Sequence, residues 1–104
     1  MTVLVLARDE KDLRRYSTAI NELGKGRSNA VGSVTLTANA ASTTVSAKNC
    51  GAGSVVLLSP RSAHAAAEIA AGTLFVSTVA NGSFTLTHAS NAQNDRIFGY
   101  VCLG

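Results

Sequence analysis

Short runs of alternating apolar and polar side chains dominate residues 28–104. Alternation with a period of two is typical of strands that are buried on one face. Ser54–Ser59 differs, because it holds four apolar residues in succession and therefore predicts a central strand that is buried on both faces. The six predicted strands are Val34–Ala38, Thr43–Ala47, Ser54–Ser59, Thr73–Ala80, Ser83–His88 and Ile97–Leu103.

The strongest local signal is the dipeptide Asn81-Gly82 between two strand-like runs. Asn-Gly suits both left-handed positions of a type I′ turn, so it predicts a tight β-hairpin. A two-residue turn fixes the register of the hairpin and places four large apolar side chains on one face. We expect these side chains to form the core of the β domain: Phe75, Val79, Phe84 and Leu86.

A short helix is predicted within the series of strands. Ala63–Ala71 is rich in alanine, and Ser62 stands where a capping residue is expected. Six short strands with one inserted helix fit a mainly β protein that forms a small antiparallel β-sandwich or barrel-like domain. Aromatic residues make up only 5% of the 104 residues and tryptophan is absent. The core of this domain is therefore expected to be thin.

Residues 1–27 form a distinct N-terminal segment, because they contain 10 of the 15 charged residues of the chain. A helix is predicted over residues 10–23, capped by Asp9 and ended by Gly24. Its large apolar residues recur every three or four positions and make a narrow stripe that is typical of a coiled-coil seam. The predicted oligomer seam comprises Leu6, Leu13, Tyr16, Ile20 and Leu23.

Two interpretations of this stripe remain open at the level of sequence. A helix of about 14 residues is marginal alone in water, so the stripe packs either against identical chains or against the domain that follows. Self-association is favoured because the stripe is narrow and the rest of the helix is polar. A thin core and an exposed stripe are both relieved by burial against copies of the same chain. We therefore expect a homotrimer with a short coiled-coil-like stalk.

Residues that carry catalysis are sparse. His64 and His88 have no predictable nucleophile or carboxylate partner, so we expect both at the surface or at a sheet edge. Cys50 and Cys102 belong to no CxxC or metal-ligand spacing, and we expect packed free thiols, with a disulfide as the alternative. The sequence thus predicts a protein that is not an enzyme and has no cofactor and no metal site.

The charge pattern nominates neither nucleic acid nor membrane as a partner. The net charge is +3, and the basic residues of the N-terminal segment alternate with acidic ones instead of forming a stripe. No apolar run approaches the roughly 20 residues of a membrane span. Val3–Ala7 is too short for the core of a signal peptide, so we expect synthesis in the cytoplasm. In the otherwise neutral β region, Asp95 and Arg96 are expected to form a structural ion pair or loop-fixing hydrogen bonds.

Two stretches of the chain carry a resemblance. Residues 26–45 begin Gly-Arg-Ser-Asn-Ala-Val-Gly-Ser-Val-Thr-Leu-Thr, and residues 82–96 read Gly-Ser-Phe-Thr-Leu-Thr-His-Ala-Ser-Asn-Ala-Gln-Asn-Asp-Arg before a closing aromatic and aliphatic strand. Both stretches resemble small virion proteins of tailed bacteriophages, of the head-fibre, decoration and tail-fibre-like kinds. The resemblance covers about residues 24–104.

The resemblance implies a structural protein, typically a trimer, whose N-terminal arm fastens to the particle while the β domain is displayed outward. It matches the helical stalk and the loop before the closing strand to Leu13, Tyr16, Ile20, Leu23, Asp95 and Arg96. We therefore expect a virion protein made in the host cytoplasm, a trimeric head fibre or capsid-decorating appendage whose partners are its own copies and capsid or other virion proteins. The alternative is a tail-fibre or receptor-binding module that recognises a glycan or protein on the host surface.

Overall fold

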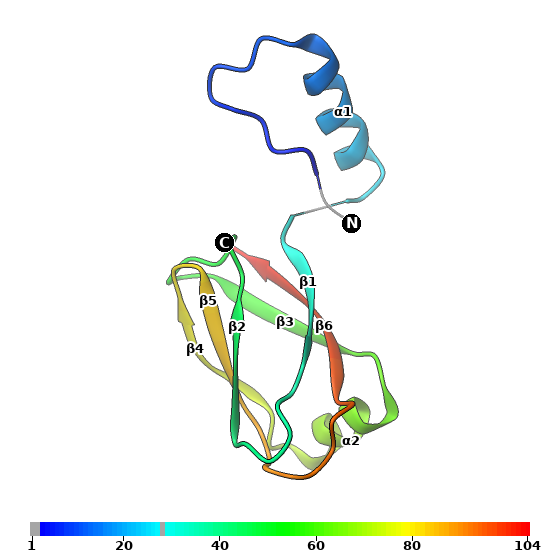
Figure 1. Cartoon of the computed structure of the whole chain (residues 1–104), viewed down its shortest axis with the longest axis vertical. Coiled ribbons are helices and arrows are strands. Elements are labelled where there is room, and N and C mark those ends of the chain that lie inside the picture. Colours follow the sequence, from blue (N-terminus) through cyan, green and yellow to red (C-terminus); the bar gives the residue numbers. More distant parts are fainter. Residues whose placement is uncertain (1–2, 28) are drawn as a thin grey trace.

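The computed structural model describes residues 3–27 and 29–104, and the chain measures 51 × 26 × 17 Å along its principal axes. Figure 1 shows an N-terminal arm, residues 3–27, at one end of the molecule and a short helix at the other. The β domain lies between them. In chain order the elements are α1 (Leu13–Gly24), β1 (Val31–Thr35), β2 (Ser42–Ser46), β3 (Val55–Pro60), α2 (Ala63–Ala71), β4 (Phe75–Ala80), β5 (Ser83–Thr87) and β6 (Ile97–Leu103).

The strands form two antiparallel sheets of three strands, in the orders β1-β6-β3 and β2-β5-β4. The predicted mainly β class, with antiparallel strands and one inserted helix, is confirmed. The prediction that residues 54–59 form a central strand is wrong, because β3 lies at the edge of its sheet. The middle position belongs to β6, which pairs with β1 on one side and with β3 on the other.

The short helix α2 forms where the sequence predicts it. Ser62 is its N-cap, and the Ser62 hydroxyl accepts a hydrogen bond from the amide of Ala65 at 3.1 Å. Gly72 ends the helix in the left-handed conformation, with φ of 74°, which costs glycine no steric strain. Local capping chemistry therefore determines both ends of α2.

The hairpin of β4 and β5 has the predicted register, with Val79 opposite Phe84. The predicted type I′ turn is wrong, however. Gly82 has a φ of 82°, whereas Asn39 is the only described non-glycine residue with a positive φ, so Asn81 does not take the left-handed conformation. Asn81 is instead held by its side-chain oxygen, which accepts a hydrogen bond from the amide of Ala52 at 3.1 Å.

A register shift in β4 changes which side chains face the interior. The pairing moves by one residue between Val76 and Thr78, as in a β-bulge. The shift leaves Val76 packed against the core and turns Phe75 outward, where it is 57% exposed. The predicted core position of Phe75 is therefore wrong. A single extra residue reverses the faces of a strand, because successive side chains point to opposite sides.

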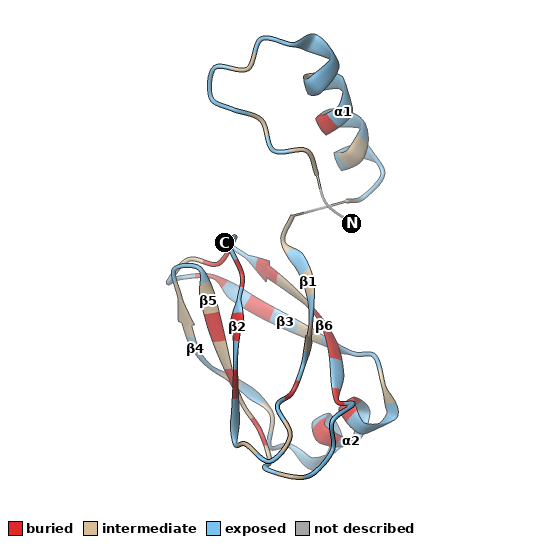
Figure 2. Cartoon of the chain, viewed as in Figure 1, coloured by how far each residue is buried: buried red, intermediate tan, exposed pale blue. Residues whose placement is uncertain are grey.

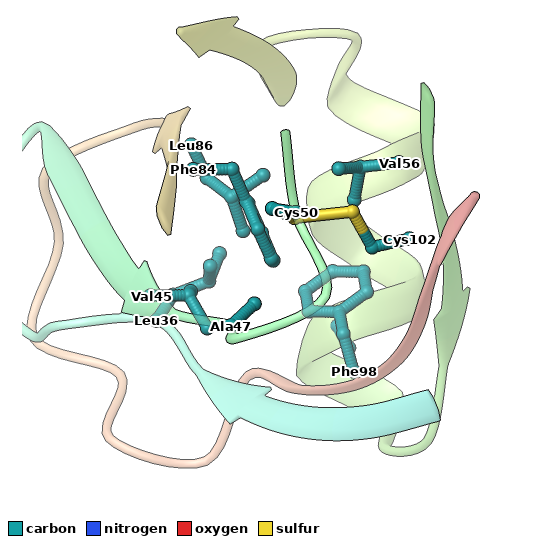
Figure 3. Packing of buried hydrophobic residues seen from close by; sticks show 10 residues of the cluster. Leu36, Val45, Ala47, Cys50, Val56, Phe84, Leu86, Phe98 and Cys102 are labelled. Atoms are coloured by element: carbon teal, nitrogen blue, oxygen red, sulfur yellow. A yellow bond between two sulfur atoms is a disulfide. The ribbon is translucent and has the colours of Figure 1, made fainter. Parts of the chain in front are cut away.

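The core lies between the two sheets (Figure 3). Phe84 and Leu86 are fully buried as predicted, and Val79 packs against the cluster while only partly buried. Figure 2 shows that buried residues concentrate in the β domain and α2, whereas most of the arm is exposed. The buried apolar cluster comprises Leu36, Val45, Ala47, Cys50, Val56, Ala65, Phe84, Leu86, Phe98 and Cys102.

A disulfide closes one end of this core. Cys50, in the turn before β3, is bonded to Cys102 on β6, with a Cα–Cα distance of 5.9 Å (Figure 3). The expectation of free thiols is therefore wrong, and the alternative, a disulfide, is what the structure shows. Because β3 pairs with β6, Val56 lies opposite Cys102 and the preceding turn comes back to the same end of β6. This proximity arises from strand pairing and leaves no signal in the spacing of the cysteines.

Candidate functional site

The arm presents a helix whose boundaries differ from those predicted. Asp12, and not Asp9, is the N-cap of α1, and its side chain accepts a hydrogen bond from the amide of Arg14 at 3.0 Å. The left-handed residue after the helix is Gly26, with φ of 78°. The helix therefore starts about one turn later than the predicted span of residues 10–23.

The chain that precedes α1 folds back along one side of the helix. The Tyr16 hydroxyl donates a hydrogen bond to the carbonyl of Glu10, and the amide of Leu4 donates to the Glu22 carboxylate at 3.2 Å. Ala19 is buried on this side, at 6% exposure. These contacts give α1 a covered side without any contribution from the sheets.

Three residues of the predicted seam remain uncovered. Leu13, Ile20 and Leu23 are 77%, 66% and 59% exposed, and positions seven and ten residues after Leu13 lie on the same side of a helix. We call these three residues the arm stripe. Leu6 lies before the helix and Tyr16 is half-buried against the preceding chain, so neither extends the helical stripe as predicted.

The outward face of the β2-β5-β4 sheet is rich in hydroxyl groups, and we call it the hydroxyl face. The Thr44 and Thr85 hydroxyls, on neighbouring strands, lie 3.2 Å apart. Phe75 stands at one corner, opposite Thr87. The serine and threonine residues of this face are Ser42, Thr44, Ser46, Thr78, Ser83, Thr85 and Thr87.

The outward face of the β1-β6-β3 sheet is apolar, and we call it the apolar face. It contains an open pocket of about 210 Å³ whose lining includes Val31, Leu57 and Val101. Sequence reasoning missed this face, because a run that is apolar on both sides was expected at the centre of a sheet and not at its edge. The face comprises Val31, Val55, Leu57, Ile97, Val101 and Leu103.

The predicted ion pair between Asp95 and Arg96 does not form. Arg96 turns inward and pairs with Glu68 of α2 at 3.4 Å, and both side chains are almost fully buried. Asp95 turns outward and pairs with His64, with 2.6 Å between its Oδ1 and the imidazole Nδ1. The sequence indicates neither the carboxylate partner of Arg96 nor that of His64, because α2 and the loop before β6 meet only in the folded chain.

Arg96 does fix loops, which was the other prediction for this residue. Its guanidinium donates hydrogen bonds to the carbonyls of Ala89, at 2.8 Å, and Thr37, at 3.2 Å. Glu68 accepts from the amide of Ala89 at 2.8 Å and from the Thr73 hydroxyl at 3.0 Å. This buried pair ties α2 to three connecting segments.

The surroundings of Glu68 change its acidity. Burial by itself raises the pKa of the carboxyl, but the hydrogen bonds from Ala89 and Thr73 and the charge and hydrogen bond of Arg96 outweigh burial, so the pKa lies below its ordinary value. The carboxylate is therefore ionised at neutral pH. Its role is structural, because the charge is fully engaged inside the domain.

His88 lies in the same interior, so the expectation that it lies at the surface or at a sheet edge is wrong. It is 4% exposed, with Nδ1 3.0 Å from the Ala89 carbonyl and Nε2 2.7 Å from the Thr43 hydroxyl. Because a carbonyl only accepts hydrogen bonds, Nδ1 carries a proton and donates it to Ala89. Both ring nitrogens are thus occupied by the protein itself.

Within residues 3–27 and 29–104, no group of three or more His, Cys, Asp or Glu side chains could hold a metal ion. In the same described part of the chain, no helix is long and apolar enough to cross a membrane. Comparisons with protein-family models, with curated proteins and with solved structures gave no match. The candidate binding surfaces of the described chain are therefore the arm stripe and the two outward sheet faces.

Proposed function

We propose that this chain is a structural subunit of a bacteriophage particle, a trimeric head fibre or capsid-decorating appendage anchored through its N-terminal arm. The observation that carries the proposal is the arm stripe. Leu13, Ile20 and Leu23 are all more than half exposed, while the adjoining side of α1, with Tyr16 and Ala19, is covered by the chain's own residues. A 12-residue helix is marginal in water, so burial of this stripe against other chains stabilises it.

The stripe fits three helices that pack around a common axis. In such a bundle Leu13 and Ile20, seven residues apart, occupy equivalent positions of successive heptads. The arm lies at one end of the molecule (Figure 1), so three parallel arms place three β domains on the same side of the bundle. A particle that holds the arms then displays the β domains outward.

The β domain has features suited to display outside a cell. The Cys50–Cys102 disulfide links β6 to the turn before β3, and disulfides persist in oxidising surroundings, virion surfaces among them. Glu68 and Arg96 tie the loops around α2 together in the interior. The hydroxyl face carries no ionised side chain, which limits nonspecific charge-driven adhesion.

Mass and mutation of the arm stripe test the proposed assembly. We expect the full chain to have three times the 10.6 kDa monomer mass in light scattering. The variant Leu13→Asp/Ile20→Asp should weaken the trimer, because it places charges on the stripe. The matched control Thr18→Asp/Asn21→Asp adds the same charge at exposed positions outside the stripe and should leave the mass unchanged. A monomer for the unmodified chain contradicts the proposal.

The particle itself provides the second test. Antibodies raised against the β domain should label purified particles of the phage that encodes the chain. A preparation complemented with Leu13→Asp/Ile20→Asp should lose the label, whereas Thr18→Asp/Asn21→Asp should retain it. Absence of the unmodified protein from purified particles overturns the virion assignment.

A second candidate function is supported by the hydroxyl face. Phe75 is 57% exposed at the corner of this face, beside a grid of serine and threonine hydroxyls. Sugars and proteins are bound by surfaces that combine an exposed aromatic ring with hydrogen-bonding groups. On this alternative the appendage recognises a host-surface glycan or protein. Phe75→Ala should then abolish binding to host cells or a glycan array and Phe75→Tyr should preserve it, whereas retained binding by Phe75→Ala rejects this role.

A further inference from the structure

The apolar face is continuous across all three strands of its sheet. Val31 of β1 and Leu57 of β3 flank Val101 of β6, and Val55 pairs with Leu103 in the next outward row. Leu57 and Val55 remain 58% and 61% exposed. Exposed apolar patches of a few hundred Å² mark interaction sites more often than plain surface.

The opposite sheet shows that an outward apolar face is not required by the fold. Both sheets have three antiparallel strands and bury their inner faces in the same core, yet the hydroxyl face is lined by serine and threonine. The two faces thus differ in chemistry and not in architecture. The apolar face is the one that benefits from being covered.

Arg61 is the charged residue among those that line the pocket of this face. Its backbone amide donates to the carbonyl of Ile97 at 2.8 Å, and its guanidinium lies over Gly99, where an added Cβ would come within 3.0 Å of it. Among the described residues its side chain makes no hydrogen bond or ion pair. A partner that covers the apolar face would therefore be expected to bring a carboxylate to this end of it.

A second copy of the chain supplies such a carboxylate. Glu68 and Asp95 are the only acidic side chains of residues 29–104, and Glu68 is buried. Asp95 is about half exposed; its Oδ1 is paired with His64 of the same chain, so the other carboxylate oxygen is the one a partner would meet. Its backbone carbonyl accepts a hydrogen bond from Ser62, the residue after Arg61. Asp95 and Arg61 therefore lie at the same end of the domain. Two domains side by side in parallel place Arg61 of one copy level with Asp95 of the next, whereas antiparallel packing places them at opposite ends.

We propose that the apolar face is the surface through which the β domains of identical copies pack side by side in parallel, with Arg61 paired to the partner subunit's Asp95. This inference rests on the proposed self-assembly and names the contact that the β domains add to the arms. A stable interface buries about 800 Å² on each partner and has an apolar centre with a polar rim. Val31, Val55, Leu57, Val101 and Leu103 supply the centre, and the next row, Ser33, Gly99 and Ser59, supplies with Arg61 the polar rim at the α2 end.

The first experiment measures the dissociation constant of the full chain by sedimentation equilibrium. Leu57→Lys should raise it at least tenfold, and Leu57→Ser should raise it less. The control Thr44→Lys, which adds the same charge to an exposed strand position on the hydroxyl face, should leave it unchanged. Thermal unfolding of the three variants checks that each remains folded. Repeating the series in the Leu13→Asp/Ile20→Asp background removes the contribution of the arm stripe.

The second experiment tests the parallel arrangement by exchanging charges. Arg61→Glu and Asp95→Arg should each weaken association, and the double variant Arg61→Glu/Asp95→Arg should restore at least half of the loss in binding free energy. A double variant as weak as the single ones overturns the parallel pairing.

The outcomes separate this inference from the proposed function. A monomeric unmodified chain overturns both. An oligomer whose dissociation constant is the same for Leu57→Lys and Thr44→Lys overturns only the inference, as does complete dissociation by Leu13→Asp/Ile20→Asp alone. Loss of particle attachment by Leu57→Lys without weaker self-association also overturns it, since the face would then bind another virion protein.

Discussion

The guanidinium of Arg96 faces the carboxylate of Glu68 in the interior of the β domain, with 3.4 Å between Nη1 and Oε2. Arg96 is 1% exposed and Glu68 is 4% exposed. The β domain has few charged residues, and two of opposite sign, Glu68 of α2 and Arg96 of the loop before β6, lie together in its interior. They replace apolar packing with hydrogen bonds to the loops that join strands from both sheets.

Breaking this pair should cost more stability than any surface substitution. Glu68→Leu leaves the buried Arg96 cation without its counter-ion and should lower the free energy of unfolding by about 3 to 5 kcal/mol. Arg96→Met removes the cation and also its hydrogen bonds to the carbonyls of Ala89 and Thr37. The double variant Glu68→Leu/Arg96→Met should be less destabilised than the sum of the single variants, because neither charge is then left alone. Urea unfolding measures all three, and strictly additive losses would contradict the pairing.

The pair should also make the stability of the domain depend on pH in the acid range. The pKa of Glu68 is lowered in the folded state from an ordinary value of 4.5, so the folded state favours the ionised form. The resulting stabilisation is complete above pH 4.5 and is lost as the pH falls through the lowered folded-state value. Glu68→Gln should unfold at lower urea concentration at pH 7 and show a flatter decline below pH 4.5. Equal acid slopes for the two proteins would argue against this role.

Truncation of two phenylalanines on adjacent strands should change the free energy of unfolding by very different amounts. Phe84→Ala should cost about 3 to 5 kcal/mol, because it empties a position at the centre of the core. Phe75→Ala should change stability by no more than about 0.5 kcal/mol, because its side chain is largely in solvent. The two substitutions are chemically identical, so the difference in thermal or urea unfolding isolates burial. A large loss of stability in Phe75→Ala would mean that the Phe75 side chain lies in the core, and would contradict the register shift in β4.

The disulfide should contribute strongly to stability. The bond between Cys50 and Cys102 closes a loop with a sequence separation of 52 residues, for which the chain-entropy model gives about 4 kcal/mol. Cys50→Ser/Cys102→Ser should therefore melt well below the unmodified chain. A reducing agent should lower the melting temperature of the unmodified chain and leave the double variant unaffected. Identical melting of oxidised and reduced protein would show that the thiols are not linked.

The sequence was informative at several places where structure depends on neighbours along the chain, although it misplaced the N-cap of α1 and the type of the Asn81-Gly82 turn. The boundaries of α2 follow from Ser62 and Gly72, and the register of the hairpin follows from its two-residue turn. Prediction failed at Phe75, because a bulge within β4 inverts its face, and at β3, because an apolar run does not say which strand will lie beside it. These failures share one cause, since strand pairing joins residues that are distant in the sequence.

Much of the candidate site depended on such pairing as well. The exposed leucines and isoleucine of the arm stripe could be read from helical spacing, although the covered position of Tyr16 could not. Glu68 was visible only as a lone charge in a neutral region, and Arg96 was expected to pair with Asp95 or to fix loops; the scarcity of charges is the one signal that could have suggested a buried pair. The partners of Asp95 and Cys50 lie 31 and 52 residues away.

The sequence alone determined the class of this protein: a charged N-terminal helix with an apolar stripe, followed by short alternating strands with local caps and turns. Only the tertiary structure decided which faces those strands present, which charges meet in the interior and that the two cysteines are joined. The physical reason is that periodicity and capping act within a few residues, whereas strand order, bulges and buried pairs are set by packing between distant segments.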